Sequence, residues 1–364
     1  MKLYFAIDKP FEHENPYVAV LIRRLYEIDS KIEIGWGVSK FWTDEIFNFD
    51  IIHIQWPELL WKAGKKNLPE TEKRFADIKA KGIKIVATCH NQIPHYCKDP
   101  AIIQNSEITY KSCDLILHLG NYSLNIFQGL YPKVQNKILY HHIYDDKENP
   151  YFDKKEACKH LKISSQYKYI LCLGTFRDEE EKAMILSLSK SFENRKIKII
   201  APSFFRLKQP TGIRSFLKFL KKRIQIAITL LRFRNVITFG KYMPDSELPY
   251  LYNACDLVLI QRLKILNSGN LPLGFYMGKV VVGPKEGNVG EILNATQNPT
   301  FDPKDLSTLP NAIFKGLALE KNGKGQENKE YSIKHFASKH IANILYGYYK
   351  ELLSTKSTDA VDPA

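Results

Sequence analysis

The chain has 364 residues, of which 44% are hydrophobic and 25% charged, and its formal net charge is +14 at pH 7. This composition excludes a disordered chain and leaves room for two packed domains. No apolar stretch reaches the roughly 20 residues that span a bilayer, and the first residues are too short for a signal peptide, so we expect a cytoplasmic protein. The positive charge favours polyanions, either nucleic acid or an anionic membrane surface.

The first half of the chain alternates apolar runs with amphipathic stretches, as in a parallel sheet covered by helices. We expect strands over residues 2–7, 31–35, 50–55, 84–88, 114–118 and 137–140, and helices over 17–28, 70–81, 101–112 and 123–130. Ligands of such sheets bind where the strands end. The segments after the strands are therefore the first place to look for a site.

Three of those segments are rich in polar and aromatic residues. Residues 8–17 read Asp-Lys-Pro-Phe-Glu-His-Glu-Asn-Pro-Tyr, residues 53–58 read His-Ile-Gln-Trp-Pro-Glu, and residues 88–95 read Thr-Cys-His-Asn-Gln-Ile-Pro-His. Their carboxylates, imidazoles and one indole would meet at one edge of the sheet. Such a group can bind a polar ligand and move a proton.

Several of these residues are candidates for a catalytic base. Imidazole titrates near neutral pH, so His90 or His95 can deprotonate or position a hydroxyl group. A carboxylate can serve as well, and the alternatives are Asp8, Glu12 and Glu14. His90 can instead do no more than hydrogen-bond neighbouring loops, and Trp56 can be a core aromatic.

The second half repeats the alternation after an exposed linker over residues 144–153. We expect strands over 169–173, 196–201, 235–241, 256–260 and 279–282, and helices over 154–161, 213–234, 244–254, 306–319 and 331–353. Residues 321–330 read as a polar loop. The pattern predicts a second parallel sheet.

The predicted helix over residues 213–234 is basic along one face and apolar elsewhere. Its polar residues fall within an arc of about 100° at helical spacing: Arg214, Lys218, Lys221, Lys222, Gln225, Thr229 and Arg232. Arg223 and Arg234 interrupt the apolar face. This pattern is typical of a helix that lies in an anionic membrane surface, and the alternative is a helix packed on its own sheet.

A second feature lies between the strands at 256–260 and 279–282. A helix is expected there whose first turn carries Ser268, Gly269 and Asn270. Free backbone N–H groups and the positive end of the helix dipole make such a turn a cradle for a diphosphate, with an ordinary capped helix as the alternative. Arg262, just upstream, adds a possible phosphate contact.

This strand–helix–strand unit, with Pro284 and a loop containing Gly287, Gly290 and Glu291 behind it, resembles the donor-binding unit of GT-B glycosyltransferases. The retaining branch of that family carries a Glu-x7-Glu motif on this helix. Here the two positions hold Ile265 and Leu273. The resemblance therefore favours inversion of configuration.

An ordered set of motifs narrows the resemblance. The Asn-Pro-Tyr of residues 15–17, the Trp-Pro-Glu of residues 56–58, residues 88–95 and Ser268-Gly269 together resemble bacterial exopolysaccharide glycosyltransferases, including β-mannosyltransferase-like members. The chain departs from the group at Gln55, where His is usual, and in the Gly-Lys-Val-Val of residues 278–281, where Pro is usual.

The resemblance implies an α/β protein of the GT-B fold, with two Rossmann-like doubly wound parallel-sheet domains that face each other across a cleft. Residues 1–148 would bind the acceptor and residues 149–335 the nucleotide sugar. Residues 336–353 would form a helix that returns to the first domain, and residues 354–364 a disordered tail.

The resemblance also implies roles for individual residues. The diphosphate group would be bound by Gly174, Thr175, Arg177, Lys182, Arg262, Ser268, Gly269 and Asn270, where Lys182 replaces a family lysine whose position here holds Glu180. Gly240, Lys241, Tyr242 and Glu291 would lie near the base and ribose. Asn15, Tyr17, Trp56, Glu58 and Asn91 would bind the acceptor. The catalytic candidates are His90, His95, Asp8 and Glu14, with Arg214, Lys218, Lys221 and Lys222 docking to the membrane.

The implied activity is transfer of a sugar from a UDP- or GDP-sugar to a lipid-linked or polysaccharide acceptor, at the inner face of the cell membrane. We expect no metal, since Arg177, Arg262 and the helix N-terminus can carry the diphosphate charge and no Asp-x-Asp motif occupies a suitable loop. We also expect no cofactor and no nucleic-acid partner. The alternatives are a GT-B-like nucleotide-sugar epimerase, which consumes no acceptor, and a basic nucleic-acid-binding protein. The sequence contains no zinc-finger spacing, helix-turn-helix or RNP-like motif that would support the nucleic-acid-binding alternative.

Overall fold

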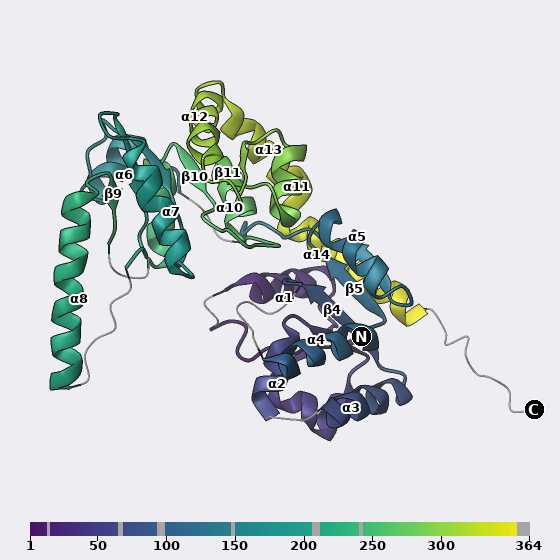
Figure 1. Ribbon diagram of the computed structural model, residues 1–364. Helices are drawn as coiled ribbons and strands as arrows, with labels where there is room; N and C mark the ends of the chain where they lie inside the picture. Colours follow the sequence, from purple (N-terminus) through teal and green to yellow (C-terminus); the bar gives the residue numbers. More distant parts are fainter. Residues whose placement is uncertain are drawn as a thin grey trace, which may run out of the picture. The chain divides into compact units, whose positions relative to one another are not determined.

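The computed structural model describes residues 1–12, 15–64, 68–92, 99–146, 150–205, 212–239 and 243–354, without the side chains of residues 62–64 and 213–215. The chain forms two compact units, each with its own sheet (Figure 1). Unit 1 comprises Met1–Asp146 and His335–Ala364. Unit 2 comprises Lys147–Lys334.

In the part of unit 1 that the structure describes, the sheet has six parallel strands. They are β1 (Lys2–Phe5), β2 (Glu33–Trp36), β3 (Ile51–Ile54), β4 (Lys84–Cys89), β5 (Leu115–His118) and β6 (Gln135–Ile138). Their order is β2-β1-β3-β4-β5-β6, so the winding reverses between β1 and β3. The apolar strand β3 is buried along its length, as expected for a central strand covered on both faces.

The helices of unit 1 include one from the far end of the chain. They are α1 (Tyr17–Ile28), α2 (Pro57–Gly64), α3 (Leu68–Ala80), α4 (Pro100–Ser112), α5 (Asn121–Leu130) and α14 (Ser338–Ser354), with 3-10 turns at Ser39–Trp42 and Asp44–Asn48. α14 packs against α1, and Arg24 Nε donates to Ser338 Oγ at 2.7 Å. Leu345 and Tyr349 of α14 join the core of unit 1.

The described part of unit 2 has a second six-stranded parallel sheet. Its strands are β7 (Lys168–Leu171), β8 (Ile197–Ile200), β9 (Val236–Ile237), β10 (Leu257–Leu259), β11 (Val280–Pro284) and β12 (Thr300–Phe301). The order β12-β11-β10-β7-β8-β9 places the reversal between β7 and β10. In doubly wound sheets a ligand binds at this point, beyond the carboxyl ends of the two strands.

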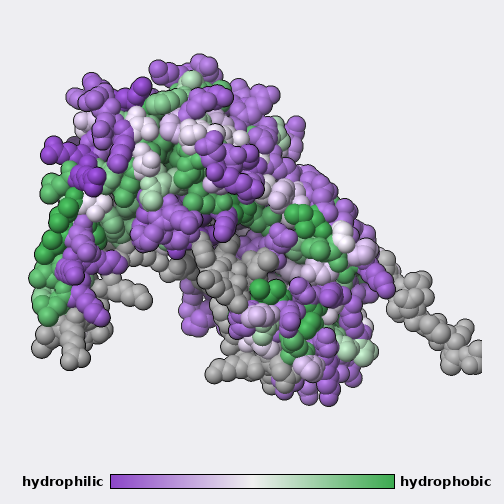
Figure 2. Space-filling view, in the orientation of Figure 1, coloured by the Kyte–Doolittle hydropathy of each residue, from purple (hydrophilic) through white to green (hydrophobic). Residues whose placement is uncertain are grey.

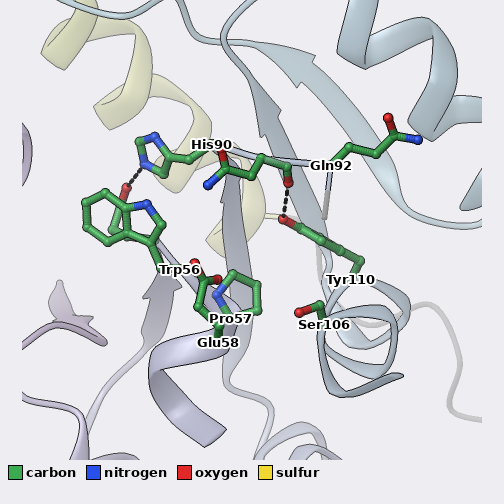
Figure 3. Close-up of a pocket in the computed structure, with 9 residues that line it drawn as sticks. Trp56, Pro57, Glu58, His90, Gln92, Ser106 and Tyr110 are labelled. Atoms are coloured by element: carbon green, nitrogen blue, oxygen red, sulfur yellow. Dashed lines mark hydrogen bonds between the residues drawn. The ribbon is translucent and has the colours of Figure 1, made fainter. Parts of the chain in front are cut away.

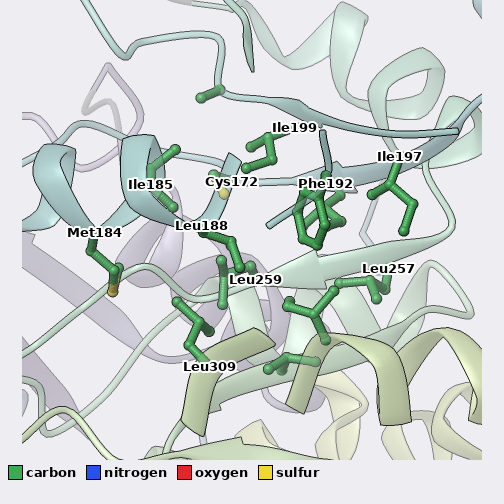
Figure 4. Close-up of a cluster of buried hydrophobic side chains, with 14 of the residues drawn as sticks. Cys172, Met184, Ile185, Leu188, Phe192, Ile197, Ile199, Leu257, Leu259 and Leu309 are labelled. Atoms are coloured by element: carbon green, nitrogen blue, oxygen red, sulfur yellow. The ribbon is translucent and has the colours of Figure 1, made fainter. Parts of the chain in front are cut away.

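The helices of unit 2 cover this sheet, apart from α8. They are α6 (Lys154–His160), α7 (Glu179–Lys190), α8 (Ile213–Arg232), α9 (Leu248–Ala254), α10 (Asn270–Tyr276), α11 (Gly287–Ala295), α12 (Thr308–Lys321) and α13 (Lys324–Phe336), with a 3-10 turn at Asp245–Glu247. Figure 4 shows the core that forms on one face of the sheet, where Leu188 of α7 and Leu309 of α12 meet Leu259 of β10.

Two segments expected as loops are helices, so those predictions were wrong. The glycine-rich segment forms α11, because Gly287 adopts a φ of +70° and its lack of a Cβ lets it lie against the carbonyl of Ile265. The polar segment forms much of α13, where the buried Asn328 donates to the Lys279 carbonyl at 3.0 Å and exchanges hydrogen bonds with Asn298.

The helix expected over residues 331–353 is divided, since α13 ends at Phe336 and α14 begins at Ser338. The amide of Ser338 donates to the Asp145 carboxylate, which fixes the start of α14. Among the described helices, none is both long and apolar enough to cross a membrane.

Candidate functional site

The first candidate site lies in unit 2, where the winding reverses between β7 and β10. Gly174, in the loop after β7, has a φ of +94°, which favours glycine. A Cβ placed on Gly174 would lie 3.7 Å from Arg262 Nη2 and 3.9 Å from Asn270 Nδ2. Gly174 therefore leaves a space that is bordered by two nitrogen donors from the other side of the reversal. An anion suits such a space.

A buried carboxylate holds Arg262 in this position. Oε2 of Glu181, at the start of α7, accepts from Arg262 Nη1 at 2.6 Å and from the backbone amide of Arg177 at 2.8 Å. Glu181 is only 1% exposed, and this burial raises the pKa of its carboxyl group, whereas the two donors lower it. Because one end of the guanidinium is fixed, the other is held beside Gly174.

Asn270 is fixed by the loop after β7. Its Nδ2 donates to the Leu173 carbonyl at 2.9 Å, and its backbone amide donates to Ser268 Oγ at 3.3 Å. Gly269 occupies the N-cap position of α10, so Ser268 and Gly269 precede the helix. The structure thus places Gly174, the backbone amide of Arg177, Arg262 and Asn270 around the loop after β7.

The other residues expected near the donor fall in different surroundings. Thr175 is half-buried in the same loop as Gly174. Lys182 pairs with Glu179, one turn earlier on α7, at 2.5 Å. Glu291 is half-buried on α11. The expected base-binding residues Gly240, Lys241 and Tyr242 lie outside the described residues.

The second candidate site is a pocket in unit 1 at the ends of β3 and β4 (Figure 3). Its volume is about 220 Å³ including the solvent at its mouth, and its lining comprises Gln55, Trp56, Pro57, Glu58, His90, Asn91, Gln92, Ser106 and Tyr110. The structure therefore brings together Trp56, Glu58, His90 and Asn91, from two of the segments that the sequence singled out.

His90 is held in this pocket on three sides. Its ring stacks on Trp56 with centroids 4.6 Å apart and planes 18° apart, and it meets the ring of Tyr17 edge-on at 5.0 Å. Its Nε2 lies 2.9 Å from Oε1 of Gln55. Burial lowers the pKa of His90 to about 3, with smaller effects from His53 and His142, so the imidazole is neutral at pH 7.

A chain of hydrogen bonds continues from Gln55 into the core of unit 1. Gln55 Nε2 lies 3.1 Å from His53 Nε2, and His53 Nδ1 lies 2.6 Å from the Tyr349 hydroxyl of α14. Gln55 and His53 are buried, and burial lowers the pKa of His53 to about 3. With its oxygen facing His90, the amide accepts from Nε2–H. The lone pair of the neutral His90 ring is then on Nδ1.

Among the described residues, three further candidates of unit 1, Asp8, Asn15 and Tyr17, do not line this pocket. Tyr17 is fully buried and stacks on His142 at 4.6 Å, so it supports His90 from the core. Asn15 accepts from the Tyr17 amide at 3.1 Å, which shapes the start of α1. Asp8 accepts from the Val38 amide at 2.8 Å. Glu14 and His95 lie outside the described residues.

Sequence reasoning missed the residues that support both sites. Glu181 looked like one of several acidic residues in the first turn of a helix, where carboxylates are common for electrostatic reasons. His53 belonged to the segment over residues 53–58, but nothing in the sequence linked it to Tyr349. The segment around Ser106 and Tyr110 carried no motif either.

Within the ranges that the structure describes, no group of three His, Cys, Asp or Glu side chains gathers closely enough to hold a metal ion. The positively charged group that lies beside Gly174 is the guanidinium of Arg262.

No model of a known protein family matches the chain, and no curated protein is significantly similar in sequence. Solved structures do resemble it. Sucrose-phosphate synthase from Thermosynechococcus elongatus superposes with a TM-score of 0.71 at 12% identity, covering 98% of this chain and 99% of that one. A glycosyltransferase from Rickettsia africae gives a TM-score of 0.68 at 13% identity, covering 98% and 99%.

HepE of Anabaena, solved in complex with UDP-glucose, gives a TM-score of 0.67 at 12% identity and covers 96% of this chain and 100% of that one. Identities this low show the fold alone. The six-stranded sheets, their strand orders and these likenesses agree on one architecture, which was expected from the sequence. The chain has the two-domain α/β fold of the GT-B glycosyltransferases.

Proposed function

We propose that the chain is a glycosyltransferase that moves a sugar from a UDP- or GDP-sugar to a lipid-linked or polysaccharide acceptor in cell-surface polysaccharide assembly. The observation that carries this proposal is the space at Gly174, bordered by Arg262 and Asn270 at the reversal between β7 and β10. A protein of the same fold, HepE, has been solved with UDP and with UDP-glucose. That supports a nucleotide sugar as the ligand.

The chemistry of the leaving group explains these residues. When the glycosidic bond to the donor breaks, negative charge develops on the departing nucleoside diphosphate. The Arg262 guanidinium and the Asn270 amide would donate to its oxygens, with Arg177 beside them. Because Glu181 already holds Arg262 in place, little reorganisation accompanies the reaction. On this proposal no metal ion is required.

Unit 1 would hold the acceptor. Trp56, Glu58 and Asn91 would contact it in the pocket, since an indole and polar side chains suit a sugar. His90 would take the proton from the attacking hydroxyl through Nδ1, which carries the lone pair of the neutral ring. The absence of the two glutamates of the retaining branch favours inversion, in which the hydroxyl attacks directly.

The class of acceptor determines where in the cell the protein would act. A lipid-linked acceptor stays at the membrane, so the protein would be cytoplasmic and bound peripherally to the inner face of the cell membrane. The high positive charge of the chain supports this location, because that leaflet is anionic.

Binding of a panel of UDP- and GDP-sugars, measured by calorimetry, tests the proposal. We expect one nucleotide class to bind and Arg262→Ala to weaken it by about tenfold to a hundredfold, the effect of losing a hydrogen bond to a charged group. Arg234→Ala, an exposed control in the same unit, should bind like the wild type. Failure of every nucleotide sugar to bind, or equal binding by both variants, would contradict the proposal.

A further inference from the structure

Helix α8 differs from the other helices of unit 2 in its charge and its exposure. Over Ile213–Arg232 it contains no acidic residue, and its charged residues are Arg214, Lys218, Lys221, Lys222, Arg223 and Arg232. Each described side chain of α8, from Phe216 on, is exposed or half-exposed. In Figure 1 the helix extends away from the sheet of unit 2.

Large apolar side chains are exposed along one side of α8. Leu217, Ile228 and Leu231 are 62%, 60% and 68% exposed, and Phe216, Leu220 and Ile224 are also exposed. At about 100° per residue these six positions fall within an arc of about 120°. Figure 2 shows apolar surface running along α8 beside hydrophilic surface. A continuous apolar stripe of this kind marks an interaction surface.

Cations border this apolar arc on both sides. Lys221, Arg232, Lys218 and Lys222 follow it on one side, and Arg223 lies at its opposite edge. Arg223 therefore lies at one border of the exposed stripe, and the half-exposed Phe219, Ile226 and Leu230 continue the apolar face of the helix beyond it. Arg234 lies beyond the end of the helix. Of the two arginines expected to interrupt the apolar face, only Arg234 falls outside the helix.

We propose that α8 lies in the interfacial region of an anionic lipid bilayer, with the apolar arc among the upper acyl chains and the bordering cations on lipid phosphates. A helix in this setting buries its apolar face by roughly 5–10 Å and keeps its Lys and Arg side chains at the headgroups. The inference deepens the proposed function. It rests on that function in one respect, because a membrane-bound acceptor gives the protein a reason to be at a membrane. It names the element that makes the contact.

The charge of α8 selects a lipid surface over a second copy of the chain. Two copies packed through this arc would bring all-basic helices together, and the repulsion would oppose the contact. An anionic headgroup region offers the opposite charge on both borders of the arc, and acyl chains cover the apolar side chains between them.

Sedimentation with vesicles of phosphatidylcholine containing 30% phosphatidylglycerol, compared with pure phosphatidylcholine, tests the inference. The full-length protein should bind the anionic vesicles far more strongly. Ile224→Ser with Ile228→Ser should reduce binding by about a hundredfold, because each buried isoleucine contributes about tenfold or more. Lys218, Lys221 and Lys222 changed together to Gln should give a similar loss.

Leu130→Ser is the matched control, since Leu130 is 56% exposed on α5 of unit 1 and should not affect vesicle binding. Unchanged binding of the Ile224/Ile228 variant would overturn the inference. A second result would also overturn it: the wild-type protein does not bind vesicles but forms a dimer, and the Ile224/Ile228 variant is a monomer. Nucleotide-sugar binding measured on the same samples separates failure of this inference from failure of the proposed function.

Discussion

Each of the two sheets has six parallel strands in the part of the chain that the structure describes, but the side chains at their carboxyl edges differ in chemistry. The edge of unit 1 holds a chain of neutral groups, in which Gln55 connects His90 to the buried His53. The edge of unit 2 holds an ion pair, in which Glu181 fixes Arg262 beside Gly174. Burial acts on both edges, but the site of unit 2 fixes its proposed functional side chain through a buried ion pair, whereas the site of unit 1 fixes His90 through neutral groups.

On the proposed function, this difference would let one architecture serve two chemical tasks. A group that removes a proton must be uncharged beforehand, and burial keeps the His90 imidazole neutral, while the lowered pKa also makes it a weaker base than a free histidine. A group that stabilises a diphosphate must stay charged and fixed, which a buried carboxylate partner ensures.

His90→Ala gives the largest expected effect, because it removes the proposed base from unit 1 alone. Sugar transfer should fall by about 10²- to 10⁴-fold, while the affinity for the nucleotide sugar stays unchanged. Transfer is measured with a radiolabelled donor, and affinity by calorimetry. His160→Ala, a histidine on α6 that pairs with Glu247, is the control. If His90→Ala abolished nucleotide-sugar binding as well as transfer, the assignment of the base to unit 1 and of donor binding to unit 2 would be contradicted.

Arg262→Ala should destabilise the protein, because it leaves the buried Glu181 carboxylate without its charged partner. The expected loss in the free energy of unfolding is about 3–5 kcal/mol. Arg262→Ala combined with Glu181→Gln should recover much of it, since no buried charge remains. Urea unfolding followed by circular dichroism measures the cycle. A loss below about 1 kcal/mol for the single variant would show that unit 2 does not depend on this pair.

His53 should make the protein sensitive to acid. Its pKa is about 3 in the folded chain and near 6.5 when unfolded, so the unfolded state binds more protons between these values. Stability contributed by His53 is therefore complete above pH 6.5 and declines as the pH falls, by about 2 kcal/mol at pH 5. The unfolding free energy of His53→Gln should decline less between pH 7 and pH 5. Equal slopes would contradict the assignment.

Gln55→Glu should have the smallest effect and act on the two histidine rings that Gln55 contacts, His90 and His53. A carboxylate in place of the amide favours the protonated imidazole, so the pKa of His90 should rise by about one unit or more. Histidine-ring NMR signals measure this pKa, and Gln92→Glu, at the exposed side of the same pocket, serves as the control. If the wild-type ring carries its proton on Nδ1, the amide of Gln55 points the other way and His90 cannot be the base.

Much of the fold could be predicted from local patterns. Helix α1 has the bounds that its periodicity predicted, and the apolar runs identified β3 and β11. The failures came where tertiary contacts override local composition. Asn328 is helical because Asn298 and Lys279 satisfy its side chain, and those partners are distant in the sequence.

The candidate sites were predictable only in part, for a similar reason. Strand ends in a parallel sheet lie at one edge, so Gly174 and Arg262 could be expected to meet. The groups that hold the functional side chains could not. Glu181 lies 81 residues from Arg262, and Tyr349 lies 296 residues from His53. Single buried polar residues of this kind carry no periodic signal.

The most direct test of the central claim is transfer itself. Purified protein is incubated with a radiolabelled UDP- or GDP-sugar and membranes that carry lipid-linked acceptors, and the label in the lipid or polysaccharide fraction is measured together with the released nucleoside diphosphate. The account predicts one nucleoside diphosphate released per sugar transferred, and neither product without the acceptor. Conversion of the nucleotide sugar without an acceptor, or no consumption of any nucleotide sugar, would contradict it.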